Sequence, residues 1–193
     1  MDKIKMGFAL CGSFCTYSKV LPVLHKLADE YDILPIMSEI SAATDTRFGL
    51  AGDFIREIEE LTGKKIITGI ADAEPIGPQK LLDVLVVAPC TGNTLAKISH
   101  AVTDSGVAMA CKAHLRNNRP LVLAPATNDA LSASAENIGR LLVRRNVYFV
   151  PMYQDDPRGK PCSMVSDMEL IGDTVRAALE GRQIQPLLLG PRL

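Results

Sequence analysis

The chain has 193 residues, of which 47% are hydrophobic and 22% are charged, and its formal net charge is −1. These values predict one globular domain with a sizeable core rather than a disordered chain. The near-neutral charge, without any basic block, disfavours nucleic-acid binding. No apolar run reaches the roughly 18 residues of a membrane span, and the first residues are typical of a strand rather than a signal peptide.

The chain contains five cysteines, an odd number, and their spacing does not fit a zinc site. We expect free thiols in a cytoplasmic protein and no metal site. The cysteines are Cys11, Cys15, Cys90, Cys111 and Cys162.

Hydrophobic patterns predict strands that alternate with helices. The expected strands are 4–11, 33–37, 65–68, 84–88, 120–124 and 147–150. The expected helices are 16–29, 53–61, 94–102, 105–116, 131–145 and 167–179. This alternation predicts an α/β, three-layer, doubly wound parallel sheet of the flavodoxin-like or Rossmann-like kind.

Residues 1–193 are expected to form a single domain of this type. Residues 151–166 are rich in charge, glycine and proline, and we expect a loop there that can act as a lid. Residues 182–193 are expected to form an apolar, proline-containing tail that either docks on a neighbouring subunit or stays loose.

Small polar residues follow three of the predicted strands, in the segments 11–17, 88–94 and 124–129. Ligands of such sheets bind outside the carboxyl ends of the strands. A helix follows each loop, and its free N–H groups and dipole favour an anion such as a phosphate. The alternative is that these residues only cap helices. No dinucleotide fingerprint and no P-loop is present.

The three segments resemble motifs of the flavoprotein family that includes phosphopantothenoylcysteine decarboxylase and the lantibiotic peptidyl-cysteine decarboxylases. The motifs are Gly12-Ser13-x-x-x-Tyr17-x-Lys19, the segment 89–94 (PCTGNT) and the segment 125–128 (PATN). The resemblance implies bound FMN and assembly into trimers or dodecamers. It implies these cofactor-binding residues: Gly12, Ser13, Phe14, Ser38, Pro89, Cys90, Thr91, Asn93, Thr94, Ala126, Thr127 and Asn128.

The chain also departs from that family. The decarboxylases carry a histidine shortly before the segment that corresponds to 89–94, and residues 74–80 contain none. His25, His100 and His114 lie on predicted helices, where surface or packing roles are expected. Cys90 is interpreted as a packing thiol, with a nucleophile as the alternative. These differences weigh against cysteine decarboxylation, and no catalytic residue is predicted.

Within the family, the segments 12–16, 43–49 and 124–129 are most similar to the branch formed by the B subunits of dipicolinate synthases. This resemblance implies a partner, the A subunit of dipicolinate synthase, that carries the NAD(P) site. The two subunits would oxidise a dihydrodipicolinate-level intermediate to dipicolinate in the mother cell of a sporulating bacterium. The alternatives are a non-catalytic subunit of the same fold that stabilises its partner, and a flavin-dependent cysteine decarboxylase, which the missing histidine disfavours.

A dicarboxylate substrate needs cationic or N–H donors beside the flavin. Arg47, Arg158 and Lys160 are the predicted cations, and Asn128 is predicted to contact the substrate as well. Arg47 suits a bidentate carboxylate contact, although it also suits a surface position near a helix. Arg158 and Lys160 lie in the expected lid, where ordinary solvated residues are the alternative.

Overall fold

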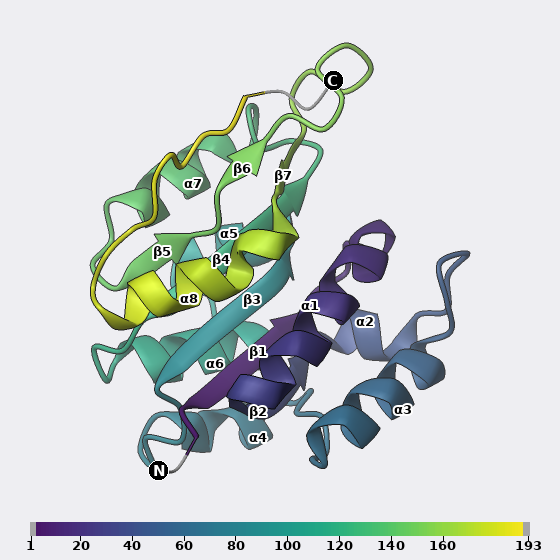
Figure 1. Ribbon diagram of the computed structural model, residues 1–193, viewed down its shortest axis with the longest axis vertical. Helices are drawn as coiled ribbons and strands as arrows, with labels where there is room; N and C mark the ends of the chain where they lie inside the picture. The colour runs from purple at the N-terminus through teal and green to yellow at the C-terminus, as the bar shows by residue number, and fades with distance from the viewer. Residues whose placement is uncertain (1–2, 191–193) are drawn as a thin grey trace.

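The computed structural model describes residues 3–190, and its helices cover both faces of one twisted sheet (Figure 1). In chain order the elements are β1 (Lys5–Leu10), η1 (Phe14–Thr16), α1 (Tyr17–Glu30), β2 (Asp32–Met37), α2 (Glu39–Ala43), α3 (Ala51–Thr62), α4 (Ile70–Ala73), η2 (Glu74–Ile76), β3 (Val84–Cys90), α5 (Gly92–Ser99), α6 (Gly106–Leu115), β4 (Leu121–Thr127), α7 (Ala135–Leu142), β5 (Val147–Phe149), β6 (Met152–Tyr153), β7 (Met164–Ser166), η3 (Met168–Leu170) and α8 (Ile171–Leu179). Within the described part of the chain, no helix is long and apolar enough to cross a membrane.

The parallel part of the sheet has the order β2-β1-β3-β4-β5, which is the flavodoxin-like order. β1 pairs with β2 from Lys5 opposite Asp32, and with β3 from Met6 opposite Val84. This arrangement confirms the predicted doubly wound α/β fold. It also brings the carboxyl ends of β1, β3 and β4 to the same edge of the sheet.

The core lies in two layers because successive side chains of a strand point to opposite faces. In β3, Val84 and Val86 join a cluster with α1, α3 and α8, whereas Leu85 and Val87 join a cluster with α5, α6 and α7. Every residue of β3 is buried, which explains why its sequence reads as an uninterrupted apolar run. Figure 1 shows α1, α3 and α8 on the near face of the sheet.

Three expectations about the elements were wrong. Residues 65–68 form no regular strand and make only a parallel bridge between Ile67 and Ile36. The predicted helix at 131–145 is shorter, since α7 begins at Ala135 after a series of turns. The sheet is not wholly parallel, because β7 pairs antiparallel with the end of β4 and with β6.

The segment 151–166 therefore begins and ends in strands, with residues 154–163 as the connection between them. Ala126 pairs with Val165, so this hairpin is fixed to the edge at which β4 ends. A lid movement of the connection stays a prediction. The hairpin nevertheless places the connection beside the strand-end loops.

The described part of the tail, up to residue 190, lies along the chain's own edge strand β6. The N–H of Met152 donates to the carbonyl of Leu187, and the N–H of Leu189 donates to the carbonyl of Met152, both at 2.9 Å. The amide side chain of Gln183 bonds the N–H and the carbonyl of Phe149 in β5, both at 2.7 Å. Neither contact needs a neighbouring subunit.

Candidate functional site

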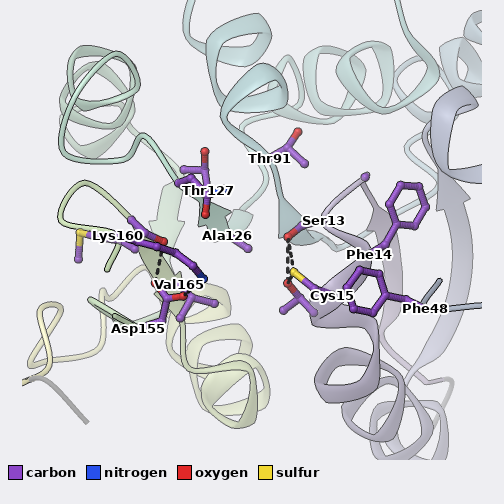
Figure 2. A pocket seen from close by; sticks show the side chains of 15 residues that line it. Ser13, Phe14, Cys15, Phe48, Thr91, Ala126, Thr127, Asp155, Lys160 and Val165 are labelled. Carbon is purple, nitrogen blue, oxygen red and sulfur yellow. Dashed lines mark hydrogen bonds and ion pairs between the residues drawn. The ribbon is translucent and has the colours of Figure 1, made fainter. Parts of the chain in front are cut away.

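A cavity of about 380 Å³ lies at the carboxyl ends of β1, β3 and β4. Its wall combines hydroxyl, amide, charged and apolar side chains from the three strand-end loops, the β6–β7 hairpin and the connection between α2 and α3. The lining residues are Gly12, Ser13, Phe14, Cys15, Thr16, Phe48, Thr91, Ala126, Thr127, Asn128, Asp155, Lys160, Ser163, Met164 and Val165. Figure 2 shows Ser13 and Cys15 on one side of the cavity, with Lys160 and Asp155 on the other.

The loop after β1 is held in place by short-range hydrogen bonds. The N–H of Ser13 donates to the carbonyl of Cys11 at 2.9 Å, and the hydroxyls of Ser13 and Thr16 lie 2.9 Å apart. The buried Tyr17 donates its hydroxyl to the same Cys11 carbonyl at 3.2 Å, and its ring packs against Phe14 and Phe54. The Ser13 hydroxyl is therefore presented to the cavity by a fixed backbone.

The loop after β3 ends in the cap of α5. The side chain of Thr91 accepts the N–H of Thr94 at 3.3 Å, so Thr91 both lines the cavity and caps the helix. The hydroxyl of Thr94 donates to Sγ of Cys11 at 3.4 Å and so connects the first loop to the second. Thr94 itself is buried and holds these loops together from behind the wall.

The loop after β4 is organised by Asp129. One oxygen of this carboxylate accepts the hydroxyls of Thr127 and Ser134, the latter at 3.0 Å. Gly92 packs directly on this cluster, since a Cβ there would lie 2.7 Å from the Ser134 hydroxyl and 2.8 Å from the Asp129 carboxylate. A side chain at position 92 would therefore displace the hydrogen-bonded cluster to which the Thr127 hydroxyl belongs.

The hairpin supplies the charged part of the wall. Asp155 accepts the hydroxyl of the buried Ser163 at 2.6 Å with one oxygen, and the ammonium of Lys160 at 3.2 Å with the other. Partial burial raises the pKa of Asp155, but the hydrogen bonds from these two donors outweigh it, so the pKa is lowered overall. The hydrogen bond to Asp155 raises the pKa of Lys160. Both groups are thus charged near neutral pH.

The described cysteines are all free thiols, and they differ in environment. Burial raises the pKa of Cys11 to about 11 and raises the pKa of Cys90 as well. The exposed Cys15 is the thiol that lines the cavity. Cys90 is buried behind the wall, as expected for a packing thiol.

The cavity brings together eight of the predicted site residues, which are Gly12, Ser13, Phe14, Thr91, Ala126, Thr127, Asn128 and Lys160. The cavity wall does not include Ser38, Arg47, Pro89, Cys90, Asn93, Thr94 or Arg158. Pro89 and Cys90 are buried within β3, and Ser38 caps α2 by accepting the N–H of Ser41 at 3.3 Å. The guanidinium of the exposed Arg47 lies over the ring of Phe48, 4.8 Å from its centroid.

Seven lining residues were not predicted, namely Cys15, Thr16, Phe48, Asp155, Ser163, Met164 and Val165. Cys15, Thr16 and Phe48 fall within segments that carried the resemblance, so the family motifs already pointed to their neighbourhood. The other four come from the hairpin, whose strands are too short to be read from the sequence.

The three histidines lie outside the cavity wall. His25 pairs with Glu57 at 2.9 Å, and His100 bonds the Ser99 hydroxyl at 2.8 Å. His114 is buried and its Nε2 donates to the carbonyl of Pro120 at 2.9 Å. Among the residues described, no group of histidine, cysteine and carboxylate side chains is arranged to hold a metal ion.

Comparison with known proteins places this chain in a family. A flavoprotein family model matches residues 1–180. The chain is 45% identical over 186 residues to the B subunit of dipicolinate synthase from Bacillus subtilis (strain 168), which covers 96% of this chain and 93% of the relative. The crystal structure of the dipicolinate synthase B subunit from Bacillus halodurans superposes with a TM-score of 0.89, at 42% identity and with both chains fully covered.

A more distant neighbour is the FMN-dependent cysteine decarboxylase SpaF. It has a TM-score of 0.65 and 22% identity, with 92% of this chain and 97% of that chain covered, so it supports the fold alone. The family model and the close relatives lead to one conclusion: the chain belongs to the flavoprotein family and, within it, is similar to the B subunits of dipicolinate synthase.

Proposed function

We propose that this chain is the flavin-binding subunit of a two-subunit enzyme that forms dipicolinate. The observation that carries the proposal is the donor-lined cavity at the carboxyl ends of β1, β3 and β4, in a chain 45% identical to the B subunit of a dipicolinate synthase. The cofactor is FMN, and the substrate is a small dicarboxylate at the dihydrodipicolinate level.

The residues of the cavity fit FMN by their chemistry. Ser13 and Thr91 offer hydroxyl groups of the kind that a phosphate and a ribityl chain need, whereas the Thr127 hydroxyl donates to Asp129 and offers its oxygen as an acceptor. Phe14 and Val165 offer apolar surface for a flavin ring. The volume of about 380 Å³ lies within the roughly 300–1,000 Å³ usual for ligand pockets. When bound, FMN supplies the two-electron acceptor for the oxidation.

The chain's own residues bind and orient the substrate. The ammonium of Lys160 is the cation of the described cavity wall and suits a carboxylate of the substrate. Asn128 is an exposed amide at the same wall and offers both a donor and an acceptor. Arg47 and Arg158 remain proposed contributors from exposed segments beside the site.

The proposal includes the assembly and the setting. The A subunit would carry NAD(P), the chain would form a homo-oligomer (a trimer or a dodecamer), and the enzyme would act in the cytoplasm of the mother cell during sporulation. Phe48, which lines the cavity, and the exposed hydrophobic side chains Ile40 and Leu50 of the same part of the sequence support a contact between copies of the chain there. A mass near 20.9 kDa by light scattering would contradict the oligomer.

Two experiments test the proposal. FMN is titrated into the purified chain and binding is followed by flavin fluorescence, with saturable binding expected. Dipicolinate formation is then measured by absorbance for the chain alone, for the A subunit alone and for the mixture. Product from the mixture only is the expected result. Full product from the A subunit alone would make this chain a non-catalytic stabilising subunit, which is the second candidate.

A further inference from the structure

The charged groups of the cavity wall form a neutral pair. Among the described residues that line the cavity, Lys160 is the one cation and Asp155 is the one carboxylate, and they bind each other at 3.2 Å. In a wall that binds only a dianion, the cation would be expected to have no carboxylate next to it. Such a carboxylate would repel the negative ligand strongly at short range. The presence of Asp155 therefore needs its own explanation.

Asp155 is held in place more firmly than an ordinary surface carboxylate. Its Oδ1 accepts the hydroxyl of Ser163 at 2.6 Å, and Ser163 is 3% exposed. Ser163 in turn precedes β7, which pairs with the end of β4. The carboxylate is thus fixed to the sheet edge, whereas the longer Lys160 side chain reaches it from the exposed connection. Figure 2 shows the pair facing Ser13 and Cys15 across the cavity.

We propose that Asp155 is a specificity-determining residue that favours a reduced ring whose nitrogen carries hydrogen, as an N–H or as a protonated imine, and disfavours the aromatic product. This inference rests on the proposed function. A paired carboxylate and ammonium complement a ligand that carries an N–H beside a carboxylate: Lys160 contacts the ligand carboxylate, and Asp155 accepts the N–H.

The aromatic product lacks that hydrogen. Its ring nitrogen presents a lone pair, and its two carboxylates make it a dianion, so both features are unfavourable next to Asp155. The product is therefore bound less tightly than the reduced ring, and oxidation itself weakens binding at the site. One charge–charge contact at the partly exposed wall is expected to change affinity by roughly tenfold.

The test uses two stable probes of the same ring size and substitution. Piperidine-2,6-dicarboxylate (cis isomer) carries a protonated ring nitrogen, and pyridine-2,6-dicarboxylate does not. Both are titrated calorimetrically into FMN-loaded protein and into flavin-free protein. The parent is expected to bind the piperidine probe about tenfold more tightly. In Asp155→Asn this preference is expected to vanish, mainly because the pyridine probe binds more tightly.

The chain offers a matched control in the adjacent carboxylate. Asp156 accepts the N–H of Gly159 at 2.8 Å within the same connection but does not line the cavity, so Asp156→Asn is expected to keep the preference. Lys160→Met is expected to lower the affinity for both probes. Ser163→Ala, which frees Asp155 without removing its charge, is expected to reduce the preference partly and serves as a second variant if Asp155→Asn folds poorly.

The outcomes separate this inference from the proposed function. The inference would be overturned if the ratio of the two probe affinities in Asp155→Asn stayed within twofold of the parent ratio. It would also be overturned if the parent protein bound neither probe, or bound both equally tightly. Failure of FMN to bind would overturn the proposed function, and the probe ratio on flavin-free protein would still decide the role of Asp155.

Discussion

The two edges of the parallel sheet use polar groups in opposite ways. At the carboxyl ends of β1, β3 and β4, hydroxyls and an amide face a cavity of about 380 Å³. At the amino ends, polar side chains bind the backbone: Arg119 donates to the carbonyls of Lys80 and Leu82, and Asn117 donates to the carbonyl of Gly77 at 2.7 Å. The same strands thus end at an open cavity and begin beside side chains that bind the backbone.

This difference indicates how function and stability are divided. A hydroxyl that is left available in a cavity contributes little to folding, whereas a backbone carbonyl that lacks a partner when buried is costly. Changes at the carboxyl edge should therefore alter ligand binding with little effect on unfolding. Changes at the amino edge should alter unfolding and leave ligand binding intact.

The largest effect is expected from Ser13→Glu at the carboxyl edge. A second negative charge within about 4 Å of the FMN phosphate costs on the order of 4 kcal/mol at an effective dielectric of 20, so FMN affinity should fall at least a hundredfold. Fluorescence titration measures this loss. Ser18→Glu, an exposed position on α1 that does not line the cavity, is the control and should bind FMN as the parent does. Unchanged affinity in Ser13→Glu would mean that the phosphate lies elsewhere.

The next effect is expected at the amino edge, from His114. Its Nε2 donates to Pro120, whereas Nδ1 is buried without a hydrogen-bond partner. Burial is the main cause that lowers the pKa of His114 to about 4, and the nearby charge of Arg119 adds to it. The unfolded chain, with a pKa near 6.5, takes up a proton between those two pH values, and the folded chain does not. Stability is therefore lost as the pH falls from about 6.5 to about 4, by about 3 kcal/mol in total.

His114→Gln tests this dependence, because a glutamine amide can keep the donor to Pro120 without titrating. Urea unfolding at several pH values should show that the difference in unfolding free energy between variant and parent shifts in favour of the variant below pH 6.5. FMN affinity at neutral pH should not change. A parallel pH profile in the two proteins would contradict the assigned pKa.

Gly92→Ala is expected to affect both properties, because Gly92 supports the carboxyl edge from behind. The added Cβ would lie under 3.0 Å from oxygens of Thr127, Asp129 and Ser134, so this cluster must shift. We expect a loss of about 1–3 kcal/mol in unfolding free energy and a weaker FMN complex. Gly52→Ala in α3, where a Cβ meets nothing within 4 Å, is the control and should be neutral or stabilising. Equal effects of the two substitutions would contradict the close packing at Gly92.

The sequence was sufficient to predict the parts of this fold that carry a long pattern. The buried run of β3 and the amphipathic repeat of α1 each specify their element locally, and right-handed crossovers then restrict the order of the strands. The strands β6 and β7 have two and three residues, so no period can be detected in them. They form because β7 pairs with the end of β4, which is a contact between distant parts of the chain.

The same limit explains why the predicted site residues and the cavity wall differ. Hydroxyl residues stand at the strand ends, but Ser38 and Thr94 lie outside the cavity wall and use their hydroxyls within the protein, for a cap and for a contact with Cys11. Sequence position alone cannot separate a hydroxyl that faces a cavity from one that faces a helix. Asp155 was missed because its place in the wall depends on pairing across the hairpin with Ser163.

The smallest effect is expected from Asp83→Asn, at the amino edge. Asp83 accepts the N–H of Lys5 at 2.9 Å and lies 3.3 Å from the guanidinium of Arg119, and the two side chains of this ion pair are 43% and 30% exposed. Asparagine keeps an oxygen for the Lys5 N–H and removes only the charge, so the loss should stay below about 1 kcal/mol, as is usual for exposed ion pairs. It should shrink further in about 1 M salt, where the screening length is about 3 Å.

Arg119→Met is the contrasting variant, and it should cost more because it also leaves the carbonyls of Lys80 and Leu82 without this donor. Urea unfolding at low and high salt measures both. If Asp83→Asn proved as destabilising as Arg119→Met, surface charge rather than backbone pairing would hold the amino edge together.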